Sequence, residues 1–357
     1  MFDQIYQGKR VLITGHTGFK GSWLSAWLLK LGAEVSGFAL PPAYDASHFE
    51  LLGLEKKIRH FEGDLRDDDR FAEVMQEIQP EIVFHLAAQA LVREAYAHPK
   101  ATFDTNAGGA VNLLEAVRHS DSVRTLVFIT SDKAYRNVDW EWGYRENDRL
   151  GGRDPYSASK GCAELIFDAY WNSFLQGKIR AATTRAGNVI GGGDWAKDRL
   201  IPDCIRSLSG GQSIEIRNPD ATRPWQHVLE PLGAYLLLGS RLEGGEGDQF
   251  CSSWNFGPGH SANRSVEEVV GTVIQHWGEG EMIVKKDPNA PHEDHWLQLN
   301  TDRANHYLKW EPVWTCPESL EETVRWYRAW HDGQAMDAFS YAQIEAYETA
   351  WQRLGRP

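Results

Sequence analysis

The sequence predicts an α/β fold in which a doubly wound parallel sheet precedes a smaller C-terminal α/β substrate domain. Two observations lead to this prediction. Continuous apolar strands alternate with helical segments in the first half of the chain, and the alternation loosens from about residue 187. Strands that are apolar along their length are typical of parallel sheets covered on both faces. A chain of 357 residues can form two coupled domains, expected at 1–186 and 187–357, with later segments free to cross back into the first.

The strands and helices of the first half follow from short apolar and amphipathic runs. Gly32 ends the first predicted helix, and Pro41 and Pro42 close the second predicted strand. The predicted strands are "RVLITG" (10–15), "EVSGFAL" (34–40), "EIVFHLAA" (81–88) and "TLVFITS" (125–131), and the predicted helices include "GSWLSAWLLKLG" (21–32) and "ATFDTNAGGAVNLLEAVRHS" (101–120).

Composition excludes several classes of protein. The formal net charge is -13, without a basic tract, which argues against a nucleic-acid binder. No apolar run approaches the roughly 18 residues of a membrane span, and the N-terminus lacks a signal pattern, so we expect a cytoplasmic protein without a membrane partner. The four cysteines are too scattered for a disulfide frame or a metal site. Most of the 15 tryptophans are expected to pack in the core.

A glycine-rich loop is the first functional motif. Gly15, Gly18 and Gly21 form G-x-x-G-x-x-G between a predicted strand and a predicted helix. Glycines let the backbone approach a pyrophosphate, whose charge then meets the helix N-terminus. The pattern could also mark a tight turn, but in this context it predicts a dinucleotide site and a Rossmann-type sheet.

The end of the second strand bears on the choice of dinucleotide. An acid that binds the adenosine ribose is expected there, but the strand ends in "GFALPPAYD" and Asp45 comes several residues late. No arginine stands there for a 2′-phosphate either, so NAD is favoured over NADP. Asp64, after the short run "RHFEG", is a candidate for the adenine edge or a solvated loop acid.

Tyr156 and Lys160 in "PYSASK" form a second motif. Their i, i+4 spacing places both on one face of a helix, where the lysine cation should lower the tyrosine pKa. Tyr156 would then take a proton from a substrate hydroxyl, and Lys160 would also hold the nicotinamide ribose. Ser131 and Asp132 end a strand expected beside this helix, and parallel sheets bind ligands at strand ends.

Long motifs resemble a known family. The glycine loop, "HLAAQALVREAY", "TSDKAY", "DPYSASK" and "TRAGNVIGGGDW" together resemble the extended short-chain dehydrogenases/reductases that act on nucleotide sugars. "EWGYRENDRLGGRDPYSASK" and "TRPWQHVLEPLGAYL" are similar to its dehydratase branch for CDP-sugars. The resemblance implies a tightly held NAD and a nucleotide-sugar domain. The cofactor-binding residues assigned on this basis are Gly15, Thr17, Gly18, Phe19, Lys20, Gly21, Asp64, Leu65, Leu86, Ala87, Ala88, Tyr156 and Lys160.

The resemblance also implies a three-step dehydration. The sugar is oxidised at carbon 4, water is lost across carbons 5 and 6, and hydride returns to carbon 6. Tyr156 matches the base for the carbon 4 hydroxyl, Ser131 the hydroxyl that bridges it to the sugar, and Asp132 the acid at carbon 6. Lys133 departs from the glutamate of the wider pattern.

As the carbon 5 base, Lys133 would need its pKa lowered by about three units, roughly 4 kcal/mol. Burial and nearby cations such as Lys160 are the expected causes. The alternative is an ion pair of Lys133 with an acid, which would place the carbon 5 base elsewhere.

Arginines of the second half are candidates for the nucleotide end, because a diphosphate needs forked donors. The expected substrate-binding residues are Asn188, Arg199, Arg217 and Arg223. A surface salt bridge is the alternative for each arginine.

Only the resemblance favours cytidine over other bases, and it also implies a homodimer or higher homo-oligomer. Another nucleotide-sugar 4,6-dehydratase, a 4-epimerase and a non-catalytic NAD-binding regulator stay open as competing functions.

Overall fold

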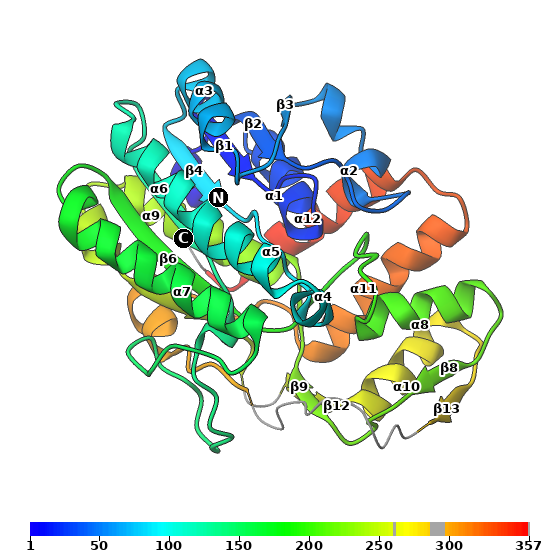
Figure 1. Ribbon diagram of the computed structural model, residues 1–357. Helices are drawn as coiled ribbons and strands as arrows, with labels where there is room; N and C mark the ends of the chain where they lie inside the picture. The colour runs from blue at the N-terminus through cyan, green and yellow to red at the C-terminus, as the bar shows by residue number, and fades with distance from the viewer. Residues whose placement is uncertain (260–261, 286–296, 356–357) are drawn as a thin grey trace.

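A single seven-stranded parallel sheet organises the chain. The structure, a computed structural model, describes residues 1–259, 262–285 and 297–355. The strand order is β11-β6-β5-β4-β1-β2-β3, so the order reverses between β1 and β4 (Figure 1). The strands are β1 (Arg10–Thr14), β2 (Glu34–Ala39), β3 (Arg59–Glu62), β4 (Ile82–His85), β5 (Thr125–Ile129), β6 (Arg180–Ala186) and β11 (Ser253–Phe256). This is the doubly wound order, and ligands of such sheets bind beyond the strand ends at the reversal.

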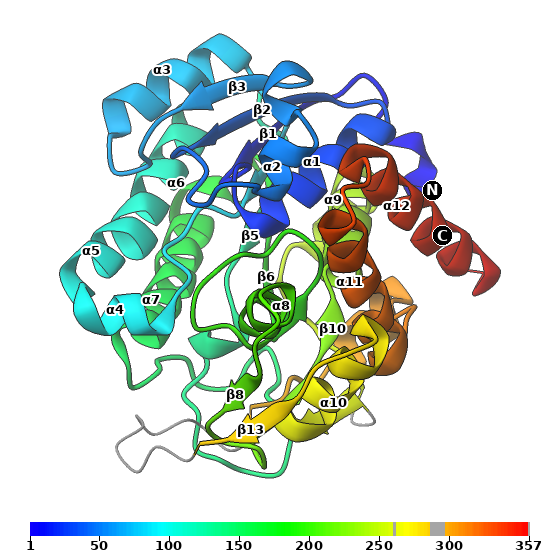
Figure 2. The same ribbon diagram turned by 90° about the vertical axis from the view of Figure 1, so that its right-hand side faces the viewer.

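Helices cover both faces of the sheet because its strands alternate apolar side chains between them. In β1, Leu12 packs into the core on one face, while Val11 and Ile13 pack into the core on the other. Figure 2 shows the two helical layers on either side. One layer contains α3 (Asp68–Ile78), α4 (Val92–Ala97), α5 (Pro99–Phe103), α6 (Gly109–His119) and α7 (Pro155–Tyr170), and the other contains α1 (Phe19–Lys30), α9 (Leu229–Glu243) and α12 (Met336–Arg353).

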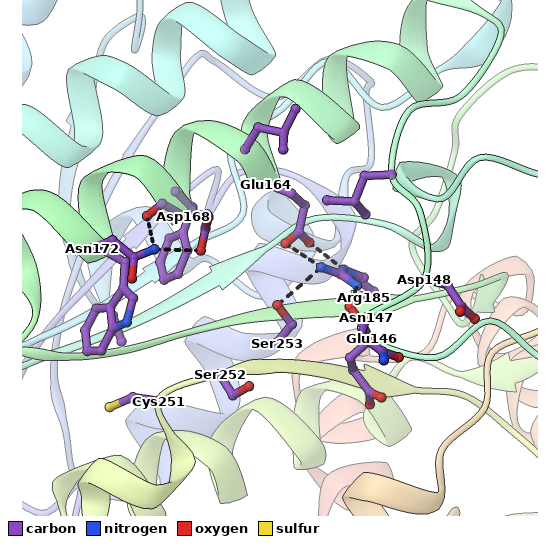
Figure 3. Close-up of a pocket in the computed structure, with 15 residues that line it drawn as sticks. Glu146, Asn147, Asp148, Glu164, Asp168, Asn172, Arg185, Cys251, Ser252 and Ser253 are labelled. Atoms are coloured by element: carbon purple, nitrogen blue, oxygen red, sulfur yellow. Dashed lines mark hydrogen bonds and ion pairs between the residues drawn. The ribbon is translucent and has the colours of Figure 1, made fainter.

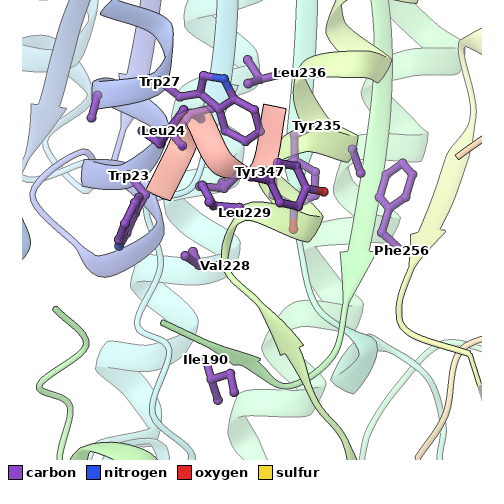
Figure 4. Packing of buried hydrophobic residues seen from close by; sticks show 14 of the residues in the cluster. Trp23, Leu24, Trp27, Ile190, Val228, Leu229, Tyr235, Leu236, Phe256 and Tyr347 are labelled. Carbon is purple, nitrogen blue, oxygen red and sulfur yellow. The ribbon is translucent and has the colours of Figure 1, made fainter. Parts of the chain in front are cut away.

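The core on the second face is rich in large aromatic side chains. Trp23, Trp27 and Tyr347 pack around α9, whose Leu229 and Leu236 are fully buried (Figure 4). Trp254, Trp310, Trp326 and Trp351 are also fully buried, which agrees with the expectation that most tryptophans pack in the core.

Segments after β6 build a smaller region beside the strand ends. Three two-stranded ladders and three helices form it, with α10 packed against both α8 and α11. Its elements are β7 (Val189–Ile190), β8 (Ile214–Ile216), β9 (Thr222–Pro224), β10 (Gln226–His227), β12 (Asn263–Ser265), β13 (Met282–Val284), α8 (Leu200–Ser209), α10 (Val266–Trp277) and α11 (Cys316–His331). The expected boundary at 186/187 falls directly after β6, yet α9, β11 and α12 return to the large sheet.

Short irregular turns connect these elements. They comprise α2 (His48–Leu51), the 3-10 turns Phe2–Gln4, Leu54–Lys56, Asp132–Ala134 and Gly247–Phe250, and the π-helical turns Asp104–Gly108, Trp171–Leu175 and Ala304–Leu308. In the described part of the chain, none of the helices has the length and apolar character of a membrane span.

Candidate active site

The glycine loop packs so tightly that it excludes side chains. Gly15 lies in the left-handed region at φ +78°, and a Cβ there would come within 2.7 Å of the Ala87 nitrogen. A Cβ on Gly21 would lie 2.2 Å from the Gly15 carbonyl oxygen. The loop therefore runs directly against the segment after β4, which contains the predicted cofactor residues Leu86 and Ala87. Its open backbone and the N-terminus of α1 make a cradle that fits a dinucleotide pyrophosphate.

Lys20 brings a cation from this loop towards the catalytic residues. It lies in the first turn of α1 and is half-buried. Its pKa is lowered to about 8, chiefly by burial and also by the charge of Arg199, while Asp132 and Asp194 act in the opposite direction. The sequence assigned Lys20 to the cofactor, but its charge also reaches Asp132.

The segments after β2 and β3 are the ones predicted to face the adenosine. β2 ends at Ala39 without an acid, and the Thr17 hydroxyl donates to the Leu40 carbonyl at 2.8 Å. Asp64 follows β3, and its carboxylate accepts from the Arg66 guanidinium, which holds the Asp64 pKa below its usual range. Asp64 therefore carries a negative charge there, whether or not it meets the adenine.

Ser131, Asp132, Tyr156 and Lys160 converge at the end of β5. Each is at most 8% exposed. The Ser131 hydroxyl donates to Asp132 Oδ1 at 3.0 Å, and the Lys133 backbone N–H donates to the same oxygen at 2.9 Å. These bonds order the turn that carries Asp132 and Lys133. Ser131, Asp132 and Lys133 are therefore held in a fixed arrangement directly after β5.

Helix α7 presents the tyrosine and the lysine. Pro155 occupies its first turn, and the Asp154 side chain caps it by accepting from the Ser157 N–H at 2.9 Å. Tyr156 and Lys160 consequently lie one turn apart on the buried face, as the spacing predicts.

The pKa of Tyr156 differs from the sequence expectation. Burial raises it, while a hydrogen bond with Ser131 and the charge of Arg199 lower it. The net direction is upward because removing the phenol from water disfavours the phenolate more than these groups favour it. The prediction that the Lys160 cation would lower the Tyr156 pKa is therefore wrong when only the protein's own groups act on Tyr156.

Burial also shifts Lys160 and Asp132. The pKa of Lys160 falls to about 8, chiefly by burial, with a further lowering by Lys20 and a rise from Glu164. The pKa of Asp132 is raised by burial, against the charge of Lys133. A carboxyl that retains its proton is what the acid role requires. Lys133 lies half-buried beside them.

The four residues predicted to bind the substrate differ in position and exposure. Arg199, at the start of α8, makes an ion pair with Asp194 at 2.8 Å, and its charge reaches Tyr156. The structure therefore places the charge of Arg199 within reach of Tyr156. Asn188 lies between β6 and β7, Arg223 on β9 is half-buried, and Arg217 after β8 is exposed.

Sequence reasoning missed residues that distant segments bring to the site. Arg264 on β12 stands directly opposite Arg223 on β9, so the two side chains share one face of the ladder. Asn106, in a π-helical turn, donates to Ser159 of α7 at 2.8 Å and to the Gln89 carbonyl at 3.0 Å. No local pattern in the sequence relates these partners. Among the residues that the structure describes, no cluster of His, Cys, Asp and Glu side chains could hold a metal ion.

Comparison with known proteins shows the family of the chain. A family model described as GDP-mannose 4,6 dehydratase matches residues 12–323. The chain belongs to this family. It is 48% identical to the CDP-glucose 4,6-dehydratase of Salmonella typhimurium over 99% of this chain and all of that protein.

More distant relatives share the architecture. The dTDP-glucose 4,6-dehydratase of Xanthomonas campestris is 25% identical over 94% of this chain and 98% of its own. The structure of the Bacillus anthracis dTDP-glucose 4,6-dehydratase, in complex with NAD, superposes with a TM-score of 0.76 at 22% identity, covering 91% of this chain and 98% of that one. The latter likeness is one of fold, and it confirms the Rossmann-type prediction.

Gly15→Ala tests the cradle. The added methyl would meet the Ala87 backbone and would force a left-handed conformation on a residue with a Cβ. We expect NAD affinity, measured by calorimetric titration, to fall by more than about tenfold, or about 1.4 kcal/mol. Gly271→Ala on α10 is the matched control, since nothing lies within 4 Å of its added Cβ. Unchanged NAD affinity in a folded Gly15→Ala protein would contradict the assignment.

Proposed function

We propose that this protein catalyses the NAD-dependent dehydration of CDP-glucose to CDP-4-dehydro-6-deoxy-glucose. The observation that carries the proposal is the 48% identity to a CDP-glucose 4,6-dehydratase along the whole chain. The buried acid Asp132, next to Lys133 and beside Ser131, Tyr156 and Lys160, supports it. A 4-epimerase needs only Ser131, Tyr156 and Lys160. The additional adjacent pair of Asp132 and Lys133 therefore favours dehydration.

The glycine cradle of Gly15, Gly18 and Gly21 would hold the NAD pyrophosphate, with Thr17, Phe19 and Lys20 in the same loop. Leu65, Leu86, Ala87 and Ala88 complete the proposed cofactor site together with Asp64, Tyr156 and Lys160. NAD, when bound, supplies the oxidation at carbon 4 and the matching reduction at carbon 6.

Tyr156 is the proposed base for the carbon 4 hydroxyl. Its raised pKa means that the phenolate needs a positive neighbour, and the charge of Arg199 already acts in that direction. The Ser131 hydroxyl, hydrogen-bonded to Tyr156, would bridge the phenol and the sugar oxygen. The Lys160 ammonium would stabilise the Tyr156 phenolate before it takes the proton from the carbon 4 hydroxyl.

Asp132 is the proposed acid for the departing carbon 6 hydroxyl. Burial raises its pKa, so the carboxyl keeps its proton to higher pH than an exposed aspartate. Lys133, which leaves the same turn, is the proposed base at carbon 5. Asp132 and Lys133 are neighbours in the chain, and the two carbons on which they would act are neighbours in the sugar.

The diphosphate of the substrate would meet the smaller region. Arg223 and Arg217, with Asn188, are the proposed contacts, and Arg264 opposite Arg223 offers a second guanidinium on the same face. Arg199 is proposed to serve the sugar end, since its charge acts on Tyr156.

The cellular setting follows from the chemistry. We propose a cytoplasmic enzyme that supplies deoxysugars for surface polysaccharide such as lipopolysaccharide O-antigen. We also propose a homodimer or higher homo-oligomer. Leu165 on α7 and Phe174 just after it are 61% and 52% exposed, and exposed apolar side chains of this size are suited to a subunit contact.

A nucleotide-sugar screen tests the activity. Purified protein with NAD should convert CDP-glucose to a 4-keto-6-deoxy product, detected by its ketone absorbance and by mass spectrometry. UDP-glucose, dTDP-glucose and GDP-mannose should react more slowly. Formation of CDP-galactose alone would favour the epimerase. NAD binding without turnover of any sugar would favour the non-catalytic regulator.

Lys133→Ala tests the base at carbon 5. Oxidation at carbon 4 does not use Lys133, so transient NADH absorbance in a single turnover should persist. Exchange of the carbon 5 proton with solvent deuterium, followed by NMR, should slow strongly. Exposed Lys56→Ala is the control. Exchange at the wild-type rate in Lys133→Ala would remove Lys133 from this role.

The alkaline limb of the pH profile tests Lys160. Its pKa of about 8 is lowered by burial, so the ammonium is present below that pH and is lost above it. We expect kcat to fall as pH rises through about 8. In Lys160→Arg the limb should disappear, because arginine keeps its charge. A limb that stays unchanged in Lys160→Arg would assign the titration to another group.

A further inference from the structure

A buried ion pair lies behind the catalytic residues. Arg185 of β6 and Glu164 of α7 form two parallel hydrogen bonds, Nε to Oε1 and Nη2 to Oε2, each 2.8 Å long. Their side chains are 2% and 3% exposed. Figure 3 shows the guanidinium facing the carboxylate, with the Ser253 hydroxyl on its other side.

Glu164 joins the two elements that carry Tyr156 and Ser131. It follows Lys160 by four residues, so Tyr156, Lys160 and Glu164 lie along one face of α7. Its carboxylate also accepts a hydrogen bond from the hydroxyl of Thr130, the residue directly before Ser131. The same carboxylate therefore fixes the helix with Tyr156 relative to the strand end with Ser131.

Arg185 holds the other end of the catalytic turn. Its Nη1 donates to the Tyr135 hydroxyl at 2.7 Å, and its guanidinium lies 4.8 Å from the centre of that ring. Tyr135 follows the turn of Asp132 and Lys133 directly. Directly after β6, a Cβ on Gly187 would lie only 3.1 Å from Asp132 Oδ2, so the end of this strand also leads to the acid itself.

Stability alone does not require such a pair. Replacing a buried ion pair by apolar side chains of similar volume is often neutral or stabilising, because two charges no longer need to leave water. Removing one partner is costly, because it strands the other charge. A cavity of about 390 Å³ opens onto Glu164 and Arg185, so water can reach a stranded charge and limit that cost.

We propose that Glu164 and Arg185 are positioning residues for the dehydration, which hold Ser131 and the Asp132–Lys133 turn in register with Tyr156 and Lys160. The proposal rests on the function proposed above. Neither residue is assigned a contact with substrate or cofactor, and both act through the groups they hold.

The charge of Glu164 gives the proposal a titration signature. The charged and titratable groups that face Lys160 are Lys20 of α1, His85 of β4, and Tyr156 and Glu164 of α7. The Glu164 carboxylate raises the pKa of Lys160, whereas burial and Lys20 lower it. Neutralising Glu164 should therefore move the alkaline limb of the rate profile to lower pH, an effect that a merely structural role would not produce.

Glu164→Gln is the first experiment. We expect kcat for CDP-glucose to fall by about 100-fold, the scale expected for a displacement of about 1 Å between reacting groups. The KM for CDP-glucose and the affinity for NAD should stay near the wild-type values. Asp168→Asn, one turn further along α7 and exposed, removes the same charge and is the matched control. Wild-type kcat and an unshifted limb in Glu164→Gln would overturn the proposal.

A double variant separates positioning from folding. Glu164→Gln with Arg185→Met removes both charges, so thermal stability should return towards that of the wild type even if Glu164→Gln alone is unstable. If the pair positions the site, kcat stays low in the folded double variant. If kcat recovers together with the melting temperature, the pair is structural only and the proposal fails. Wild-type protein that does not convert CDP-glucose would instead refute the proposed function.

Discussion

Close contact between the glycine loop and the segment after β4 is the constraint on which the site depends. Gly15 and Gly21 leave no space for a Cβ, so β1, α1 and the end of β4 approach one another at the point where the strand order reverses. That approach opens the backbone cradle and also brings Lys20, in the first turn of α1, close enough for its charge to act on Asp132 and Lys160. The cofactor cradle and the catalytic electrostatics thus share one packing arrangement.

Local pattern was enough to predict the sheet and the groups at its edge. The expected runs 10–15, 34–40 and 125–131 contain β1, β2 and β5, since apolar strands and glycine or proline stops are visible in the sequence itself. Tyr156 and Lys160 follow from helical spacing, and Ser131 and Asp132 follow from their place after a strand. These predictions succeed because each depends on neighbours within a few residues.

Burial and long-range partners could not be predicted in the same way. The rise in the Tyr156 pKa comes from desolvation by surrounding elements, which outweighs the Ser131 hydrogen bond and the charge of Arg199. The pairing of Arg185 with Glu164, and of Arg223 with Arg264, joins segments whose approach is decided only by the fold. The charge of Arg199 likewise reaches Tyr156 from a segment 43 residues further along the chain, which no local pattern relates to it.

Asp132 and Lys133 are coupled through the proton that each would carry. Burial raises the pKa of Asp132, and a positive charge on Lys133 lowers it, so a protonated lysine favours release of the carboxyl proton. An acid at carbon 6 and a base at carbon 5 require the opposite distribution, with the proton on Asp132 and none on Lys133. Burial acts on Asp132 in the direction that the acid needs, because a buried carboxylate would have to carry its charge out of water. The burial of Asp132 therefore opposes the charge of Lys133 and keeps the proton on the proposed acid to higher pH than on an exposed aspartate.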